Sequence, residues 1–400
     1  MSTATTFSED RVATTQCTRC VLTDEDIPDF QVDEAGVCST CIGFAERWGR
    51  HLKTRESREA KLEEAIRMVK EAGRDSRYDC VIGISGGVDS TYLAWKINQL
   101  GLRPIAVHFD NGWNSELAVQ NIQSLTSKLK IDLMTFVVDW PEFRDLQRAY
   151  FRASVVDIEV PTDHGIYGTL FQTAVRHNVR YVLGGNNIAT EGFMPNGWHY
   201  QKCDHINLLD IHRKFGTQPL KTYPLFDCRM KKSVAKRGVE LLEILDLIEY
   251  SREEAVSVIS GELNWRDYGV KHGESTFTKF YQGFVLPRKF GIDKRKAHLS
   301  TLIGTGELTR EGALEILAKP VYSPSELRVE REYVLKKLGF TDAEFDTIMA
   351  TPPRPHRDYE TEGSLFYEHR WLLPARPIWE KTRDLLGLRR RPRPNHFEIR

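Results

Sequence analysis

A short polar loop between two apolar segments carries the residues whose types and spacing best suit chemistry. It consists of Ser85, Gly86, Gly87, Val88, Asp89 and Ser90. Backbone N–H groups at a helix N-terminus attract anions, and glycines admit a phosphate where a Cβ would collide. Ser85 and Ser90 add hydroxyl donors, and Asp89 fits if Mg²⁺ lies between its carboxylate and the phosphates. The loop therefore predicts a pyrophosphate-binding turn, although it is no Walker A sequence. A plain strand-to-helix turn with a serine cap is the alternative, and it needs fewer special residues.

Two closely spaced cysteine pairs lie near the N-terminus. Two residues separate Cys17 from Cys20, and two separate Cys38 from Cys41, which is typical of a four-thiolate zinc site. Disulfides, or cysteines kept only for packing, are the alternatives. A closed four-sulfur site has no open coordination position, so the predicted zinc is structural. Of the other cysteines, Cys80 is expected in the core of a strand, and Cys203 and Cys228 are expected to be buried or inert thiols.

Further polar clusters occur along the chain. Asp163 stands at an expected helix start, where it is either an N-cap or a ligand of Mg²⁺ or substrate. Residues between 265 and 300 mix basic and aromatic side chains, which suits a departing pyrophosphate; nucleic-acid binding is the competing interpretation. A third cluster follows an expected strand, at the same sheet edge as the loop: Gly184, Gly185, Asn186, Asn187 and Glu191.

These residues need a scaffold, and apolar strand patterns alternate with helix patterns through the first half of the chain. Strands are expected at 79–85, 103–110, 133–139 and 181–187. Such alternation predicts a doubly wound parallel sheet with helices on both faces, an α/β fold. Ligands then sit beyond the carboxyl ends of the strands. After about residue 230 the pattern becomes helical, including 234–250 and 309–319.

The overall composition excludes some classes of protein. The 400 residues carry 56 basic and 56 acidic side chains, so no global field draws the chain to nucleic acid or to a membrane surface. The first residues lack the apolar region of a secretory signal, and no uncharged apolar stretch reaches the roughly 18 residues of a membrane span. We therefore expect a cytoplasmic protein.

The loop resembles the PP-loop of ATP pyrophosphatases, which cleave ATP between its α and β phosphates and transfer AMP to a substrate oxygen. In that superfamily the adenine lies near the end of the second strand, which implies contacts from His108, Phe109 and Asp110, largely through backbone atoms. The predicted regions are a four-cysteine zinc module with a disordered start, a linker helix, a PP-loop domain and a mainly helical substrate region, at 1–50, 51–78, 79–250 and 251–400.

The order of motifs along the chain resembles the N-acetyl sugar amidotransferases of lipopolysaccharide O-antigen and flagellin-glycan pathways. The motifs are "CTRC", "SGGVDSTYLAW", "DNGWNSE", "PTDHGI", "GGNNIATEG", "WRDYGVKHGES" and "KFGIDKRKAHLSTLI". The resemblance implies a carbon–nitrogen ligase that adenylates the acetamido oxygen of a sugar and lets ammonia displace AMP, which gives an acetamidino sugar. The implied cofactors are ATP, Mg²⁺ and structural Zn²⁺.

Roles for particular residues and partners follow from this resemblance. Asp163 and Glu191 would contact metal or substrate, and the loop would bind phosphates. The lysines expected to neutralise charge are Lys271, Lys279 and Lys289. The substrate would be an N-acetyl sugar, with or without a nucleotide carrier. The sequence has no glutaminase nucleophile elbow, so a separate glutaminase subunit, acting through a synthase-like protein, is expected to supply ammonia. Neither a nucleic-acid partner nor a membrane span is expected.

Two other functions remain open at this point. A PP-loop tRNA thiolase also adenylates a carbonyl oxygen, but it usually needs further active-site cysteines, and outside the zinc module and the first strand only Cys203 and Cys228 remain. A non-catalytic ATP-binding scaffold would keep the fold, but the intact Ser-Gly-Gly-x-Asp-Ser sequence argues against it.

Overall fold

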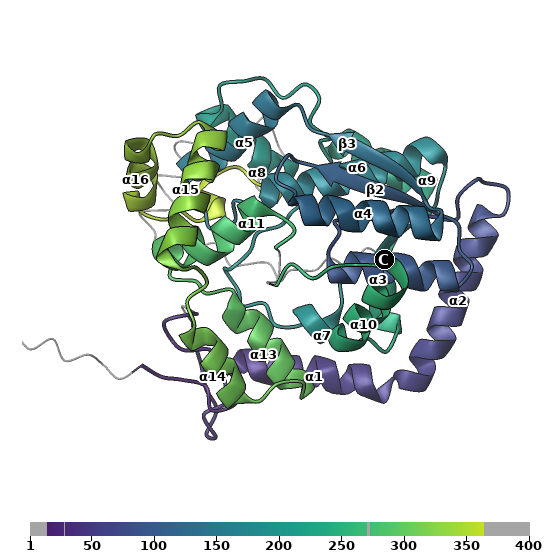
Figure 1. Cartoon of the computed structure of the whole chain (residues 1–400), viewed down its shortest axis with the longest axis horizontal. Coiled ribbons are helices and arrows are strands. Elements are labelled where there is room, and N and C mark those ends of the chain that lie inside the picture. The colour runs from purple at the N-terminus through teal and green to yellow at the C-terminus, as the bar shows by residue number, and fades with distance from the viewer. Residues whose placement is uncertain (1–13, 28, 270–272, 364–400) are drawn as a thin grey trace, which may run out of the picture.

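A five-stranded parallel sheet forms the centre of the computed structural model, which describes residues 14–27, 29–269 and 273–363 (Figure 1). The strand order is β3-β2-β1-β4-β5, and every neighbouring pair is parallel. The strands are β1 (Cys80–Gly83), β2 (Pro104–Asp110), β3 (Asp132–Val137), β4 (Tyr181–Gly184) and β5 (Glu240–Glu243). The chain moves outward from β1 to β3 and then returns to β4 on the other side. The predicted doubly wound α/β sheet is therefore confirmed.

Helices cover both faces of this sheet. Alternate residues of a strand point to opposite faces, so each face has apolar side chains to bury. Ile82 belongs to a core shared with α3 (Val88–Gln99), α4 (Glu116–Leu129) and α10 (Arg252–Leu263). Val81 belongs to the opposite core, shared with α6 (Val160–His177) and α9 (Cys228–Arg237). The three central strands, β1, β2 and β4, are buried on both faces, as a sheet covered on both sides requires.

The N-terminal region adds a cysteine module and two helices. Helix α1 (Ser39–Lys53) begins directly after Cys38 and packs against α13 (Arg295–Thr305), while α2 (Arg55–Gly73) runs along the side of the molecule (Figure 1). Helix α2 lies within the region 51–78, where the sequence predicts a linker helix. Residues 1–13 of the predicted disordered start lie outside the described residues.

The remaining helices comprise α5 (Trp140–Ala153) and α7 (Ile188–Glu191) in the first half of the chain and those of the C-terminal half, which is predominantly helical, as expected. The latter are α8 (His205–Phe215), α11 (Thr276–Phe280), α12 (Leu286–Phe290), α14 (Arg310–Ala318), α15 (Pro324–Leu338) and α16 (Asp342–Ala350). One π-helical turn, Tyr281–Val285, joins α11 to α12; short 3-10 turns span Ile244–Leu247 and His356–Asp358. Within the described ranges, no helix combines the length and apolarity needed to cross a bilayer.

Two expected boundaries differ from the structure. The segment 234–250, expected to be one helix, instead contains the end of α9, the edge strand β5 and a 3-10 turn. The open edge of β4 accounts for this, because pairing with β5 satisfies its backbone groups. Helix α6 begins at Val160, so Asp163 lies within its first turn and does not cap it.

Candidate active site at the carboxyl edge of the sheet

The predicted phosphate loop connects β1 to α3 at the carboxyl edge of the sheet. Gly86 has φ +82°, and a Cβ there would lie 2.7 Å from the carbonyl oxygen of Ala118. Both facts require glycine, since other residues rarely adopt this backbone conformation and the neighbouring atom is backbone. The indole Nε1 of Trp265 donates a hydrogen bond of 2.8 Å to the Gly86 carbonyl. The loop is therefore held in one shape before any ligand binds.

Serine hydroxyls surround the start of α3. Ser85 Oγ and Ser90 Oγ lie 3.2 Å apart, and Ser90 Oγ donates to the carbonyl of Gly87 at 3.2 Å. The Gly87 N–H donates to Ser85 Oγ at 3.2 Å, and Ser85 is exposed. This arrangement places hydroxyls and backbone donors together at a helix N-terminus, which suits an anion.

Asp89 in the first turn of α3 accepts a hydrogen bond from the hydroxyl of Tyr250. Burial, and then the nearby Asp89 charge, raises the pKa of Tyr250, so the phenol stays protonated and continues to donate. A carboxylate oxygen is a ligand that Mg²⁺ prefers, so Asp89 fits this ion beside the backbone N–H groups at the start of α3.

A segment from the C-terminal half also borders the loop. A Cβ on Gly87 would lie 3.4 Å from the Tyr268 hydroxyl and 3.6 Å from Glu274 Oε1. The carbonyl of Glu274 accepts a 2.8 Å hydrogen bond from the N–H of Ser115, the residue before α4. Sequence distance hid this contact, because Gly87 and Glu274 belong to opposite halves of the chain.

A cavity of about 1430 Å³ opens at the carboxyl ends of β1 and β4. This is where the strand order reverses direction, the usual ligand position in such sheets. Gly83 and Gly185 line the cavity, and a Cβ on Gly185 would lie 3.8 Å from the carbonyl of Asp89. The phosphate loop itself is not part of the lining but lies beside it. Seven predicted site residues do line it: Asp163, Gly184, Gly185, Asn186, Asn187, Glu191 and Lys279.

The residues predicted near the adenine lie at the end of β2. His108 Nδ1 is 2.9 Å from the carbonyl of Ile84, and its Nε2 is 3.0 Å from Asn114 Nδ2. Phe109 packs in the core against Phe136. Asp110 accepts from the N–H of Gly112 at 2.9 Å. These side chains stabilise the strand end, and the backbone of the same residues pairs with β3, so their contact with adenine stays a prediction.

Buried charges form a network beside the cavity. Lys202 Nζ lies 2.6 Å from Asp157 Oδ2 and 2.9 Å from Asp163 Oδ2. Burial acts to lower the pKa of Lys202, but Asp157 and Asp163 outweigh it and raise that pKa, so the lysine is charged. Burial, and then the charge of Asp163, raises the pKa of Glu159 to about 8. Of this network only Asp163 could be predicted from the sequence, since no local pattern marks Asp157, Glu159 or Lys202.

Glu159 has one unsatisfied carboxylate oxygen. Its Oε2 accepts from Thr278 Oγ1 at 3.2 Å, whereas its buried Oε1 has no hydrogen-bond partner. A carboxyl group whose pKa lies near neutrality can accept or release a proton at working pH. The network next to the cavity can therefore exchange a proton as well as hold charge.

The three predicted cationic residues have different positions. Lys279 lines the cavity, lies 2.8 Å from Glu330 Oε2 and packs over the Tyr322 ring. Lys289 donates to the carbonyls of Ile348 and Thr351 at 2.6 and 2.5 Å, at the end of α16. Lys271 lies outside the described residues.

Asn186 donates to Glu243 Oε1 at 2.9 Å on the cavity wall.

The cysteine module brings four sulfur atoms together. The ligand atoms of Cys17, Cys20, Cys38 and Cys41 lie within 4.8 Å of one another, and all four residues are buried. The N–H groups of Cys20 and Cys41 donate to the sulfurs of Cys17 and Cys38, each at 3.4 Å. Four converging buried sulfurs that accept backbone N–H bonds are the donor set of a structural zinc site. Within the described ranges this is the one group of three or more such ligands.

Comparison with known proteins identifies one family match and one long relative. Residues 274–372 match a family model described as the C-terminal domain of WbpG-like LPS biosynthesis proteins. The uncharacterized protein MJ1599 of Methanocaldococcus jannaschii is 22% identical over 316 residues, which cover 76% of this chain and 94% of that protein.

Two solved structures also match most of the chain. NMN synthetase from Francisella tularensis has a TM-score of 0.31 and 16% identity, over 72% of this chain and 97% of that one. The NH3-dependent NAD synthetase from Campylobacter jejuni, solved with a nitrate ion, has a TM-score of 0.31 and 13% identity. The match covers 72% of this chain and 97% of that one.

Proposed function

We propose that this chain is the synthetase component of an ATP-dependent N-acetyl sugar amidotransferase in surface-glycan biosynthesis. One observation carries the proposal: a prearranged Ser-Gly-Gly-x-Asp-Ser loop lies beside a large, charge-lined cavity at the sheet's switch point. The match of residues 274–372 to an LPS biosynthesis domain supports the glycan setting. The order of motifs supports the substrate class and extends it to flagellin glycans.

The proposed reaction has two steps. The acetamido oxygen of the sugar attacks the α phosphorus of ATP, and pyrophosphate leaves. Ammonia then attacks the activated carbon, AMP leaves, and an acetamidino group remains. An amide oxygen is a poor leaving group and AMP a good one, so adenylation makes the exchange feasible.

The chain's own residues would position the reactants and stabilise charge. Backbone N–H groups and serine hydroxyls of the loop would bind the phosphates, and Asp89, with Asp163, would hold Mg²⁺. Bound Mg²⁺ would neutralise part of the phosphate charge. Lys279 lines the cavity and would support the departing pyrophosphate. Glu159, which lies next to the cavity-lining Asp163 and has one oxygen without a hydrogen bond, would in its ionised form accept a proton released by ammonia.

Ammonia would come from a separate glutaminase subunit through a synthase-like partner. Purified chain should then use ammonium well and glutamine poorly, and adding the glutaminase should restore glutamine use. Equal rates with glutamine and ammonium in the isolated chain would reject the separate subunit.

The direct test incubates the full chain with ATP, Mg²⁺, ammonium and a panel of N-acetyl sugars, free and nucleotide-linked. Mass spectrometry should find a product in which oxygen is replaced by NH, together with AMP and pyrophosphate. Substrate-dependent pyrophosphate release separates an enzyme from an ATP-binding scaffold. Transfer RNA replaces the sugars in a parallel arm, and adenylation there alone would favour the thiolase.

A further inference from the structure

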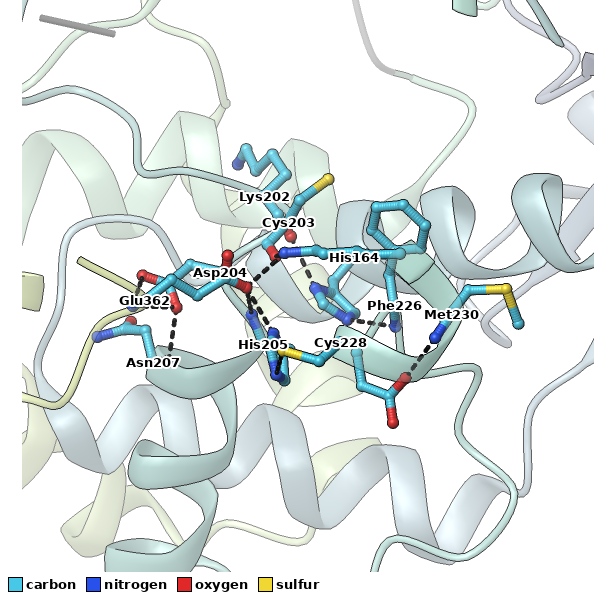
Figure 2. Close-up of polar contacts among 12 residues, drawn as sticks. His164, Lys202, Cys203, Asp204, His205, Asn207, Phe226, Cys228, Met230 and Glu362 are labelled. Carbon is cyan, nitrogen blue, oxygen red and sulfur yellow. Dashed lines mark hydrogen bonds and ion pairs between the residues drawn. The ribbon is translucent and has the colours of Figure 1, made fainter. Parts of the chain in front are cut away.

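A cysteine, a histidine and a glutamate from three distant segments meet outside the cavity lining (Figure 2). Cys228, the first residue of α9, is exposed, and its Sγ lies 3.7 Å from Nε2 of His205 at the start of α8. Nδ1 of the same imidazole lies 2.5 Å from Oε1 of Glu362. A thiol, an imidazole and a carboxylate thus lie in series, which is the order of groups that activates a nucleophile.

The charges around these three side chains favour Cys228 as the nucleophile, His205 as its base and Glu362 as the carboxylate that orients the base. Burial acts to raise the pKa of Glu362, but hydrogen bonds from His205 and Lys231 overcome it and leave that pKa lowered. An ionised Glu362 accepts a hydrogen bond from Nδ1–H of His205, so Nε2 is the imidazole nitrogen that faces the thiol. Lys231 lies one turn after Cys228 on α9, with its Nζ 2.5 Å from Glu362 Oε1. Asp227 caps α9 through Met230 N–H at 2.8 Å.

A buried histidine fixes the two arms of the series relative to each other. His164 Nδ1 lies 2.8 Å from the carbonyl of Lys202, three residues before His205, and its Nε2 accepts from the N–H of Phe226, two residues before Cys228. Burial lowers the pKa of His164 to about 4, so it is neutral and can donate at one nitrogen while it accepts at the other. The thiol and its base therefore stand on a backbone that is cross-linked by hydrogen bonds.

Cys203 offers an internal comparison. It lies in the same region of the chain but is buried, and burial raises its pKa to about 12. Nucleophilic thiols need both exposure and a neighbouring base or cation. Of the two cysteines, Cys228 has these features and Cys203 does not. Cys203 is buried, as one of the two sequence-based alternatives expected, whereas Cys228 is exposed.

We propose that Cys228 is a nucleophilic thiol that takes small disulfides, with His205 as its base and Glu362 as the positioning carboxylate. The imidazole accepts the thiol proton, the thiolate attacks one sulfur of the disulfide, and the S–S bond breaks. Half of the disulfide stays on Cys228 as a mixed disulfide, the other half leaves as a thiolate, and His205 releases its proton to water. The small disulfide is the oxidant. This inference does not depend on the proposed function.

The test follows the reaction of the full native chain with 5,5′-dithiobis(2-nitrobenzoate), a small disulfide whose released thiolate absorbs visible light. One thiol per chain should react quickly. Cys228→Ser should abolish this fast phase, whereas the matched control Cys203→Ser should keep it. A native chain with no fast thiol, or a fast phase that survives Cys228→Ser, overturns the proposal.

Two further variants separate chemistry from structure. His205→Gln should slow the fast phase by about tenfold or more near pH 7, and Glu362→Gln by less. At about pH 9.5 the His205→Gln and unaltered chains should converge, because an exposed thiol then ionises without a base. A steric effect of the substitution would slow the reaction equally at every pH and would overturn the role of His205. If His205→Gln fails to fold, Glu362→Gln carries the same pH comparison.

Discussion

Trp265 donates from its indole Nε1 to the carbonyl of Gly86 at 2.8 Å, and the indole is buried. Trp265 follows α10, so a residue from the second half of the chain holds the phosphate loop that follows the first strand. A hydrogen bond to a buried carbonyl is costly to lose, because that carbonyl finds no water in exchange. The shape of the loop therefore depends on both halves of the chain.

Gly86→Ala should damage both stability and ATP use. It combines a left-handed backbone with a Cβ 2.7 Å from the Ala118 carbonyl oxygen, so we expect a loss of about 2–3 kcal/mol and loss of pyrophosphate release. Gly101→Ala is the matched control, because Gly101 has φ +71° but its Cβ would meet only Lys70 Nζ at 3.5 Å. Chemical denaturation and a pyrophosphate assay measure both effects. Equal damage at the two glycines would contradict a special role for the loop.

Asp89→Asn should lower substrate-dependent pyrophosphate release by about a hundredfold, because an amide is a poor ligand for Mg²⁺. The amide oxygen can still accept from Tyr250, so the fold should survive. Tyr250→Phe removes only that hydrogen bond and should reduce the rate far less. Titration of Mg²⁺ should show that Asp89→Asn needs a higher concentration of the ion. An unchanged Mg²⁺ dependence would place the ion elsewhere.

The sequence predicted the parts of the site that lie within one local pattern. The loop at Ser85–Ser90 and the cysteine pairs are short motifs with fixed spacing, and both adopt the expected geometry. Glu159 and Lys202 were missed because only tertiary packing brings them to Asp163. Cys228 looked inert because His205 and Glu362 are far from it in sequence. The edge strand β5 was missed because its apolar pattern suits a helix equally well, and pairing with β4 decided the outcome.

The cysteine module should bind one zinc ion per chain. Metal analysis of the purified protein should find this stoichiometry, and Cys20→Ser should lose the ion. Since structural zinc contributes directly to folding, Cys20→Ser or a strong chelator should also lower the unfolding temperature. Cys203→Ser, another buried cysteine, should retain zinc. A metal-free protein of unchanged thermal stability would argue for packing alone.

Lys202→Met should destabilise the fold by about 3–5 kcal/mol, because it leaves the buried Asp157 carboxylate without its cation. Adding Asp157→Asn to the same chain should recover much of this loss. Asp163→Asn is the milder control, since the side chain of Asp163 is 35% exposed compared with 4% for Asp157. Denaturant titrations of the single and double variants give the coupling energy. Simple additivity of the two changes would show that the pair is not coupled.

Acid should destabilise the chain through its buried histidines. Burial lowers the pKa of His164 to about 4, against roughly 6.5 in an unfolded chain. The unfolded state therefore binds the extra proton between these values, so stability is complete above about pH 6.5 and falls as the pH drops toward 4. At about pH 5 this one residue should cost about 2 kcal/mol.

The matched variants for this pH effect lie on the same helix. His164→Gln should lower stability at neutral pH but reduce the slope of unfolding free energy between about pH 7 and 5 by up to about 1.4 kcal/mol per unit. His177→Gln changes an exposed histidine of α6 and should leave the slope intact. Urea titrations at a series of pH values measure the slopes, and equal slopes in all three chains would contradict the role of His164.

The helix that starts at the cysteine cluster also reaches the cavity. Phe44 of α1 packs so closely that a Cβ on Gly192 or Gly304 would lie 2.4 Å from its ring, and Arg47 donates to the Gly192 carbonyl at 2.8 Å. Arg47 and Gly192 both belong to the cavity wall. If the four cysteines hold zinc as predicted, loss of the ion would release α1 and with it one wall of the cavity, so metal supply would control the shape of the candidate site.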